Sequence, residues 1–291
     1  MTNLQILDGK ALAEKMYINI KNQTENMNKK PCLAVILVGS DPASQVYVNN
    51  KKKSCEKAGV TSISIEFPEN ISEKEVLDKI EELNKDSSVT GMIVQVPLPK
   101  HISEEKVLYA IDPKKDMDGF HPRNLGEVYL GKDKEFLPPA TPAGIVAMLE
   151  QNNIEIAGKE VVVVGRSNNV GKAVAMMLLN RNATVTVCHS KTQDLTFHTK
   201  RADIIIAAVG RPKFITGEMI KDGAVIVDVG IHRIANPDTS ADKKFVLCGD
   251  VDFETVKDKV SAISPVPGGV GPMTVASLIQ NTLRAFLSKE K

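Results

Sequence analysis

The chain has 291 residues, of which 42% are hydrophobic and 25% are charged, a composition typical of folded globular proteins that excludes a disordered chain. Its 37 Lys and Arg residues almost balance its 36 Asp and Glu residues, so it lacks the strong basic charge of a dedicated nucleic-acid-binding protein. The length indicates two domains or one large one, and no apolar run, such as those at residues 32–38 and 204–209, approaches the ~20 residues of a membrane helix.

In the first half of the chain, strand patterns alternate with helix patterns. The continuous apolar run 32–38 predicts a buried strand. After it, Asp41 is suited to cap a helix and Pro42 to occupy its first position, and the helix should end near Ala58 and Gly59. The further predicted elements are a strand at 60–66, a helix opened by the capping box Ser72-x-x-Glu75 and running to about Lys85, and a strand at 91–96. Strands separated by helices in this way predict a parallel sheet with right-handed crossovers.

The second half begins after a proline-rich joint at residues 137–142. Thr141 is suited to cap a helix that runs to about Asn152. A helix from about Val170 and a final amphipathic helix over 273–287 are also predicted. Apolar strands are predicted at residues 159–165, 184–188, 203–209, 224–230 and 245–248. Because these strands have no polar face, we expect helices on both sides of the second sheet.

The cysteine and histidine positions show neither a disulfide framework nor a metal-binding pattern. The four cysteines include no C-x-x-C pair, and the five histidines include no H-x-x-x-H pair. Asp116 and Asp118 do not fit a calcium loop, because Lys114 would take the first ligand position and Leu125 the twelfth. We therefore expect no metal site. The N-terminus has no signal-peptide pattern, so a cytoplasmic location is expected.

A glycine-containing turn follows the predicted strand 159–165. Gly165 and Gly171 flank a segment that joins this strand to the next helix, where the pyrophosphate of a dinucleotide meets a helix N-terminus in many α/β proteins. The spacing differs from G-x-G-x-x-G, and a Walker A loop is excluded because Ala173 stands where Ser or Thr is required. A plain strand-to-helix turn is the alternative, but the surrounding strand–helix–strand pattern favours a nucleotide site.

The end of the next predicted strand bears on which dinucleotide would bind. NAD sites usually place a carboxylate there to bind the ribose 2′-hydroxyl. Here Ser190 and Lys191 follow the strand, no carboxylate is present, and Arg166 could reach the same region. Hydroxyl and cationic groups suit a 2′-phosphate, so we predict NADP. Solvated surface charges are the alternative interpretation of Arg166 and Lys191.

Polar residues of the first half fall near one edge of the first predicted sheet. Tyr47 and Lys51 are four residues apart on a predicted helix and therefore share a face. Gln95 lies at the carboxyl end of the third strand, and Asp116 and Asp118 lie in a loop after the following helix. Singly, each is more typical of a structural residue than of a catalytic one, and their shared edge is a modest indication of a site.

The segment 265–274 has an unusual density of glycine and proline. Glycines allow the main chain to approach a ligand closely, and prolines fix its path. A flexible linker would instead be polar and rich in Gly and Ser. The composition therefore favours a rigid loop that faces a ligand over a plain interdomain linker.

Seven segments carry a resemblance to a known family, in the same order and over essentially the whole chain. They are YVNNK (47–51), VQVPLP (94–99), KKDMDGF (114–120), VVVGRSNNVGK (162–172), TVTVCHSKT (184–192), DVGI (228–231) and PVPGGVGPMT (265–274). The chain thereby resembles the bifunctional methylenetetrahydrofolate dehydrogenase/methenyltetrahydrofolate cyclohydrolase family. It departs at Ala140, where the family usually has Cys, and at Ala173, where it usually has Pro.

The resemblance implies an α/β fold of two domains with a cleft between them. Residues 1–139 would form an αβα folate-binding catalytic domain on which the C-terminal helix 272–291 packs back, and residues 140–271 a Rossmann-type NADP-binding domain. The implied reactions are oxidation of 5,10-methylenetetrahydrofolate to the methenyl compound and its hydrolysis to 10-formyltetrahydrofolate. The implied partners are tetrahydrofolate derivatives and a second copy in a homodimer, without nucleic acid or membrane. One-carbon supply to purine, histidine and methionine biosynthesis would be the metabolic role.

The resemblance also implies roles for individual residues. Lys51 would transfer protons in the hydrolysis, and Gln95 would hold Lys51 by hydrogen bonding. Tyr47 would flank the folate ring, and Asp118 would accept hydrogen bonds from the pterin edge. The expected cofactor contacts are Gly165, Arg166, Ser167, Ser190 and Ile231. The expected loop over the substrate contains Gly268, Gly269, Gly271, Pro272 and Thr274.

Two other classes of protein stay open at this point. An NADP-dependent oxidoreductase acting on another acid, such as a shikimate-type dehydrogenase, would lack the 265–274 segment and would not hydrolyse a methenyl compound. A catalytically silent nucleotide-binding regulator would keep Gly165 and Gly171 but would not need Lys51 and Asp118 together.

Overall fold

The computed structural model describes residues 4–132, 135–236 and 244–289, which form two compact units. The first unit contains residues 13–140 and 275–291, and the second unit contains residues 1–12 and 141–274. Residues 1–12 were expected in the first domain. They belong instead with the second unit, because β1 (Gln5–Ile6) pairs in parallel with β11 (Ala262–Ile263).

The first unit is built on a three-stranded parallel sheet in the order β3–β2–β4. The central strand β2 (Cys32–Val38) is buried along its whole length, as its continuous apolar run predicts. The edge strand β3 (Thr61–Phe67) is largely exposed or half-buried, whereas β4 (Gly91–Val94) is buried and ends two residues before the predicted end. The carboxyl ends of β2 and β4 therefore lie side by side, since Ile36 and Val94 are register partners.

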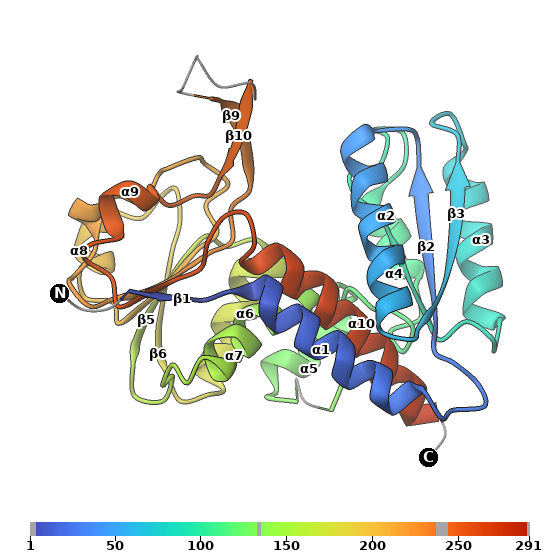
Figure 1. The fold of residues 1–291 in the computed structure, drawn as a ribbon. Coiled ribbons are helices and arrows are strands. Elements are labelled where there is room, and N and C mark those ends of the chain that lie inside the picture. Colours follow the sequence, from blue (N-terminus) through green and yellow to red (C-terminus); the bar gives the residue numbers. More distant parts are fainter. Residues whose placement is uncertain (1–3, 133–134, 237–243, 290–291) are drawn as a thin grey trace. The chain divides into compact units, whose positions relative to one another are not determined.

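The helix after β2 begins and ends where the sequence predicts. In α2 (Pro42–Lys57), the Asp41 carboxylate caps the helix by accepting a hydrogen bond from the Ser44 amide at 2.8 Å. The helix stops before Gly59, whose φ of +67° is a left-handed conformation that glycine adopts without strain. Figure 1 shows α2 on one face of the three-stranded sheet, with its first turn next to the carboxyl end of β2.

The opposite face of the same sheet is covered by two helices. α3 (Glu73–Lys85) begins at the predicted capping box, in which Ser72 and Glu75 exchange hydrogen bonds. Apolar side chains of α3 and of α4 (Glu104–Ala110) form one core with those of β2 and β4. The short helix α5 (Pro122–Tyr129) follows. This core fixes the sheet against which the candidate site is built.

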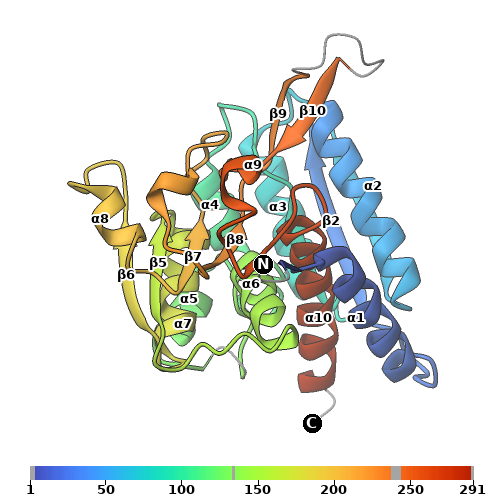
Figure 2. The same ribbon diagram turned by 60° about the vertical axis from the view of Figure 1, so that its left-hand side comes forward.

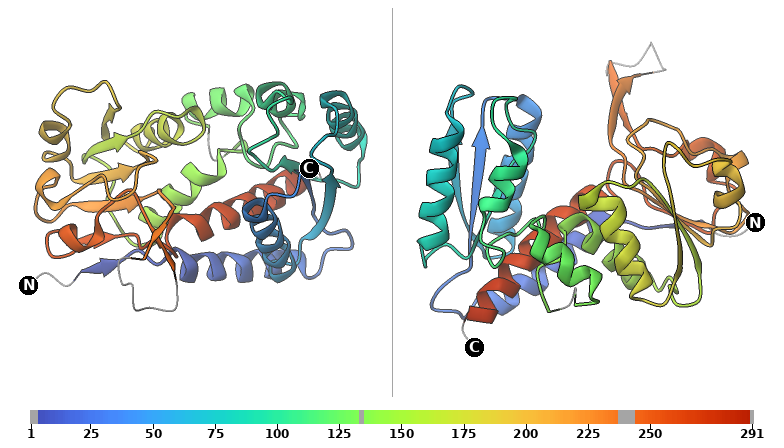
Figure 3. Two further views of the ribbon diagram at one scale, coloured as in Figure 1. Left: turned by 90° about the horizontal axis from the view of Figure 1, so that it is seen from above. Right: turned by 180° about the vertical axis from the view of Figure 1, so that it is seen from behind.

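The final helix belongs to the first unit for most of its length. In α10 (Val270–Lys289), the buried Asn281 side chain donates from Nδ2 to the carbonyl oxygens of Met117 at 3.0 Å and Pro138 at 2.9 Å. These two bonds join the helix to both ends of the segment that contains Asp118. α10 also runs beside α1 (Gly9–Thr24) in the views of Figures 2 and 3.

The second unit contains a six-stranded parallel sheet in the order β1–β11–β8–β7–β5–β6. Its strands besides β1 and β11 are β5 (Glu160–Val164), β6 (Thr184–Cys188), β7 (Ile204–Ala207) and β8 (Val225–Asp228). From β5 the chain passes to β6 on one side and then returns to β7 on the other. This reversal creates a topological switch point at the carboxyl ends of β5 and β7, where α/β sheets bind ligands.

Helical segments lie on both faces of the six-stranded sheet, as its apolar strands predict (Figures 1 and 2). One face packs against α8 (Leu195–Thr199), the 3₁₀ turn η2 (Gly217–Met219) and α9 (Phe253–Val256). The other is covered by α6 (Ala140–Gln151) and α7 (Ala173–Leu179), which a π-helical turn, η1 (Asn168–Lys172), precedes. The edge strand β6 is half exposed.

The predicted strand 245–248 exists but is not part of the six-stranded sheet. β10 (Phe245–Cys248) pairs antiparallel with β9 (His232–Ala235) in a separate hairpin, which extends away from the larger sheet in Figure 1. Its short apolar run resembles a buried strand, but every residue of β10 is exposed or half-buried. The expectation of a further buried strand was wrong.

Two helix starts also differ from the prediction. α6 begins at Ala140, so Thr141 does not cap it, and the Thr141 hydroxyl instead lies 3.0 Å from the Thr274 hydroxyl. α10 begins at Val270, three residues before the predicted start. A glycine-rich sequence predicts loop, but packing of this first turn overrides that propensity.

Candidate functional site

A buried lysine lies at the carboxyl edge of the sheet in the first unit. Lys51 on α2 is 9% exposed, and its Nζ donates a hydrogen bond of 2.9 Å to Oε1 of Gln95. Gln95 continues from β4, where its amide nitrogen bonds the carbonyl of Ile36 on β2. The Gln95 Nε2 donates to the carbonyl of Val96 at 2.7 Å, so both ends of this side-chain amide are fixed. The lysine amine is therefore held in one position by a neutral acceptor.

Asp118 enters the same site from a loop that is attached to β4. Asp116 forms an isolated parallel bridge with Met92, and the Met92 amide donates to the Lys115 carbonyl at 2.7 Å. The buried Asp116 carboxylate accepts from the amides of Gly119 and His121 at 3.0 and 2.7 Å. These bonds fix the turn that carries Asp118 next to the strand that carries Gln95.

Burial moves the pKa values of the two ionisable groups in this site towards their neutral forms. Burial raises the pKa of Asp118 to about 6, an effect to which Asp116 adds and which the positive charge of Lys51 opposes. Burial lowers the pKa of the Lys51 amine, and the Asp118 charge opposes that shift. A lysine with a lowered pKa more readily takes up and releases a proton near neutral pH.

The other expected catalytic residue is near Lys51 on the same helix but differs in exposure. Tyr47 lies one turn earlier on α2, and its side chain is 43% exposed. Lys52 and Lys53, which follow Lys51, are exposed. The structure thus brings Lys51, Gln95 and Asp118 together and leaves the Tyr47 ring open to solvent.

The glycines of the second unit allow close backbone approach at the switch point. A Cβ atom at Gly165, whose φ is +133°, would lie 2.1 Å from the Ala208 carbonyl oxygen beyond β7. A Cβ atom at Gly171 would lie 2.3 Å from the Gly165 carbonyl oxygen. The turn from β5 into η1 can therefore pack this closely only with glycine at both positions. These two close contacts explain why glycine occurs at both positions, although their spacing differs from G-x-G-x-x-G.

Arg166 and Ser190 occupy equivalent positions beyond the carboxyl ends of two neighbouring strands. Val164 and Cys188 are register partners of β5 and β6, and each candidate lies two residues beyond its strand partner. Both candidates are exposed. Beside Arg166, the Ser167 hydroxyl accepts a hydrogen bond from the Gly171 amide at the start of η1. A guanidinium group and a hydroxyl therefore follow adjacent strand ends.

Ile231 is more distant from these residues along the sheet. It follows β8, and β7 separates β8 from β5 in the strand order. Its side chain is 51% exposed. The five expected cofactor contacts therefore lie along one carboxyl edge, at three different strands.

The segment 265–274 is packed and partly helical. Gly271, Pro272 and Thr274 lie in the first turn of α10, which corrects the expectation that they belong to a loop. The Gly268 carbonyl accepts a hydrogen bond from the Lys10 amide at 2.9 Å. Gly269 is buried, and a Cβ atom there would lie 2.5 Å from the Pro265 carbonyl oxygen. The loop preceding α10 is thus a fixed turn against α1.

Three further polar residues, for which the sequence predicts no role, lie at the same edge of the second unit. Asp228, at the end of β8, and Asp250, after β10, are buried, and His232 on β9 bonds Asp250 at 2.7 Å. Asp228 lies within the apolar run 224–230 and begins the segment DVGI (228–231), but neither feature indicates its partners. Long-range packing brings the other two residues to it.

Metal-binding clusters and membrane-spanning helices are absent from the described parts of the chain. No group of three or more His, Cys, Asp or Glu side chains there could hold a metal ion. No helix within those same ranges is long and apolar enough to cross a membrane.

A doubly wound sheet with a glycine turn at its switch point, together with a separate sheet that buries a lysine, defines an α/β enzyme of the dinucleotide-dependent class. Family models agree in both halves: residues 7–118 match the tetrahydrofolate dehydrogenase/cyclohydrolase catalytic domain, and residues 139–290 match the NAD(P)-binding domain of the same name. The chain belongs to the tetrahydrofolate dehydrogenase/cyclohydrolase family.

Individual relatives match over their whole length. The bifunctional protein FolD of Agathobacter rectalis is 54% identical over 98% of this chain and 99% of its own length. The crystal structure of the bifunctional methylenetetrahydrofolate dehydrogenase/cyclohydrolase FolD of Campylobacter jejuni is 44% identical, with a TM-score of 0.93 and coverage of 99% and 100%. The Trypanosoma brucei enzyme, solved with NADP and an inhibitor, is 34% identical, with a TM-score of 0.93 and complete coverage of both chains. The expected α/β fold with an N-terminal catalytic and a C-terminal NAD(P)-binding domain is confirmed.

The Asp118 carboxyl group gives a testable pH dependence of stability. Its pKa of about 6 in the folded chain exceeds the ~3.9 of an exposed aspartate, so the folded state binds more protons between these values. Stability from this group is therefore lost as pH rises through that window. We expect Asp118→Asn to gain melting temperature relative to wild type between about pH 4 and pH 7.

An aspartate with the opposite shift provides the control. The Ser88 hydroxyl and amide lower the pKa of the exposed Asp86, so its contribution is lost as pH falls. Because this shift lies below the ~3.9 of an exposed aspartate, the difference in melting temperature between Asp86→Asn and wild type should change mainly below about pH 4 and stay nearly constant from pH 4 to pH 7. A difference between Asp118→Asn and wild type that stays constant with pH would contradict the account of Asp118.

Proposed function

We propose that this chain oxidises 5,10-methylenetetrahydrofolate to the 5,10-methenyl compound with NADP and then hydrolyses that product to 10-formyltetrahydrofolate. The observation that carries the proposal is the buried Lys51 amine, held at 2.9 Å from Gln95 beside Asp118, in a chain of this family. A silent nucleotide-binding regulator would have no use for a buried amine with a lowered pKa. A dehydrogenase for another acid does not fit membership of this family.

The second unit contains residues that fit the phosphate groups of NADP. Arg166 and Ser190 offer a guanidinium group and a hydroxyl at adjacent strand ends, which suits a 2′-phosphate. Gly165 and Ser167 would lie against the pyrophosphate at the turn from β5 into η1, and Ile231 would contact the cofactor from beyond β8. When bound, NADP accepts a hydride from the one-carbon unit of the folate.

In the oxidation step, the main contribution of the protein is to position the substrate. The two folate nitrogens stabilise the cation that remains when the hydride leaves, so no protein base is obligatory in this step. Tyr47 would flank the folate ring with its exposed side chain. Asp118 would accept hydrogen bonds from the amino-pyrimidine edge of the pterin, and such charge-assisted bonds are strong in a buried site.

The hydrolysis step requires a protein group that transfers protons. Water forms a bond to the methenyl carbon, the bond from that carbon to one folate nitrogen breaks, and one proton is released overall. Lys51 takes a proton from the attacking water and delivers one to the leaving nitrogen. Burial already lowers the pKa of this amine, and the positive charge of the methenyl compound lowers it further. Gln95 holds the amine without neutralising it.

The wider role follows from the reaction. The product is a carrier of one-carbon units, so the chain would serve purine, histidine and methionine biosynthesis in the cytoplasm. The chain's net charge of +1 gives no reason to include a nucleic-acid partner.

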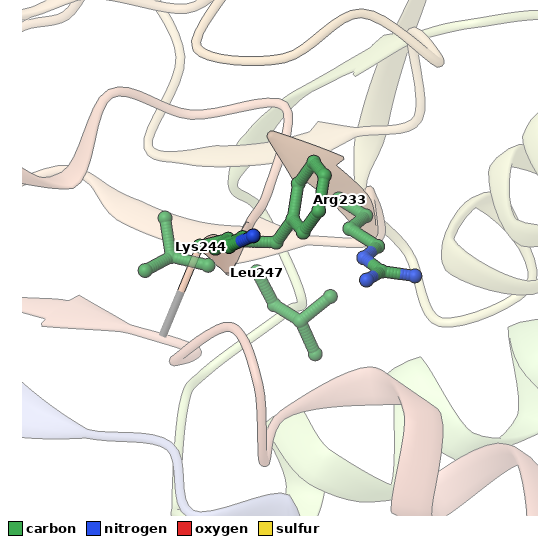
Figure 4. Close-up of a pocket in the computed structure, with 5 residues that line it drawn as sticks. Arg233, Lys244 and Leu247 are labelled. Atoms are coloured by element: carbon green, nitrogen blue, oxygen red, sulfur yellow. The ribbon is translucent and has the colours of Figure 1, made fainter. Parts of the chain in front are cut away.

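The β9–β10 hairpin is the surface on which a second copy of the chain would bind. Phe245 and Leu247 are 48% and 44% exposed on β10, and they line a hollow of about 400 Å³ with Arg233, Lys244 and Val246 (Figure 4). An isolated two-stranded hairpin is only marginally stable, and an edge strand offers main-chain groups that can pair with another chain. Pairing with the same hairpin of a second copy would cover both, which favours a homodimer with a two-fold axis.

Replacement of Lys51 by Met separates the two activities. The variant keeps an apolar stem of similar length but has no amine, so hydrolysis of the methenyl compound should fall by roughly two or more orders of magnitude. Oxidation should continue in part, and the methenyl chromophore should accumulate in a spectrophotometric assay. Lys53→Met on the exposed face of α2 is the control and should change neither step. Wild-type hydrolysis by Lys51→Met would contradict the mechanism.

The double variant Arg166→Ala with Ser190→Ala tests the choice of cofactor. Loss of two groups that contact a 2′-phosphate should raise KM for NADP by about tenfold or more, with little change for NAD, which has no such phosphate. Arg201→Ala is the control, because Arg201 is an exposed arginine that pairs with Glu160 at the amino end of β5. Equal losses with NADP and NAD would show that the two residues do not contact the 2′-phosphate.

The oligomeric state tests the hairpin. Light scattering should give about twice the 31.6 kDa chain mass for the wild type. Phe245→Asp with Leu247→Asp places charges on the exposed apolar surface and should give the single-chain mass. Tyr129→Asp, at a side chain 70% exposed on α5, is the matched control and should stay dimeric. A wild-type chain that is monomeric throughout the micromolar range would refute the dimer.

A further inference from the structure

A buried aspartate joins two connections beyond the carboxyl ends of the second sheet. Asp250 is completely buried, and its Oδ2 accepts hydrogen bonds from the amides of Val209 and Gly210 at 2.5 and 2.9 Å. Its Oδ1 accepts from the Arg211 amide at 3.0 Å and from Nε2 of His232 at 2.7 Å. One carboxylate thus holds the segment after β7 and the first residue of β9.

Asp228 extends this arrangement to a third connection. Its Oδ1 accepts from the amides of Gly230 and Asp250 at 3.0 and 2.9 Å, and its Oδ2 accepts from the Val251 amide at 3.0 Å. A Cβ atom at Gly249 would lie 1.8 Å from Oδ2 of Asp228. The main chain therefore closes tightly around both carboxylates, and we call Asp228, Asp250 and His232 the carboxylate hub.

The position of the hub bears on the nucleotide site. Ile231 lies between Gly230, which donates to Asp228, and His232, which donates to Asp250. The segment after β7 begins at Ala208, whose carbonyl oxygen is in contact with Gly165 at the switch point. Both segments that border the expected nucleotide site on the β7 and β8 side are thus fixed by the hub.

A contribution to folding stability does not by itself explain why two carboxylates are buried here. Taking a carboxylate out of water is costly, and well-packed apolar residues often replace buried charges without loss of stability. What apolar side chains cannot do is bind seven donors at defined positions. Burial also raises the pKa of Asp228 to about 6 despite three amide donors, which shows the cost of its charge.

We infer that Asp250, together with Asp228 and His232, positions the main chain of Ile231 and of residues 208–211 for binding of NADP, without touching the cofactor. The inference rests on the proposed function, because it requires that the second unit binds NADP. The hub acts by setting backbone geometry before the cofactor arrives, which lowers the ordering cost of binding. Its removal therefore weakens NADP binding selectively.

Asp250→Asn is the direct test. Both oxygens of Asp250 have donors, so an amide group in either orientation places its NH₂ against an N–H donor. Isothermal titration with NADP should give a dissociation constant raised about tenfold or more, while the affinity for the folate substrate stays at the wild-type value. Activity at saturating NADP should largely return, since the reacting groups are unchanged.

The matched control is an aspartate at the opposite edge of the same sheet. Asp203, just before β7, accepts from the Glu160 amide at the start of β5 at 2.8 Å and pairs with Lys221 in the connection that leads to β8. Asp203→Asn removes a carboxylate that holds two partners far from the expected nucleotide site and should lower the melting temperature without changing the dissociation constant of NADP. If both variants weaken NADP binding in proportion to their loss of stability, the hub is only structural and the inference is overturned.

A milder variant decides the case if Asp250→Asn does not fold. His232→Phe removes a single donor from a side chain that is 20% exposed, and it should raise the NADP dissociation constant several-fold with little change in melting temperature. His232→Gln retains a donor and should restore part of the affinity. Unchanged NADP binding in His232→Phe overturns the inference in that case. A wild-type chain that fails to bind NADP refutes the proposed function itself.

Discussion

The burial of the Lys51 amine next to Asp118 is the interaction on which the proposed chemistry depends. In water the two groups would be fully charged, but burial shifts both pKa values towards the neutral forms while their mutual attraction resists the shift. The neutral acceptor Gln95 holds the amine in place without restoring its full charge. A second carboxylate in place of Gln95 would stabilise the ammonium form and make Lys51 a poorer base.

Buried carboxylates perform a similar mechanical task in both units. Asp116 fixes the loop that carries Asp118, and Asp228 and Asp250 fix the connections beyond the second sheet. Most of the partners are main-chain amides of connections beyond strand ends, and the side chains of Asn124 and His232 add one donor each to Asp116 and Asp250. Such amides have no strand partner where a sheet ends, so a carboxylate satisfies them and defines the loop at the same time. The cost of burying the charge is offset by bonds that apolar residues cannot make.

The sequence predicted the elements whose signals are local. The strand 32–38 has a continuous apolar run, and the helix opened by Ser72 and Glu75 has a capping pattern. Neither signal needs a distant partner. Pairing between distant segments leaves no such signal, so β1 and the separate hairpin of β10 could not be predicted.

The candidate site shows the same division between local and long-range signals. Helical spacing placed Lys51 on the face of Tyr47, but only the packed chain shows that Lys51 is buried and Tyr47 is not. Asp250 was missed because its donors come from segments far away in sequence.

The two departures from the family pattern occur where the main chain makes the contact. Ala140 begins α6, and its amide donates to the Asp118 carbonyl at 3.1 Å, a bond that any residue except proline can make. Ala173 is the first residue of α7, a position that tolerates proline but does not require it. Its amide bonds the Val170 carbonyl in the preceding turn, so alanine adds a hydrogen bond there that proline cannot form. Alanine at these two buried positions therefore keeps the main-chain hydrogen bonds that hold the loop carrying Asp118 and the turn after Gly165.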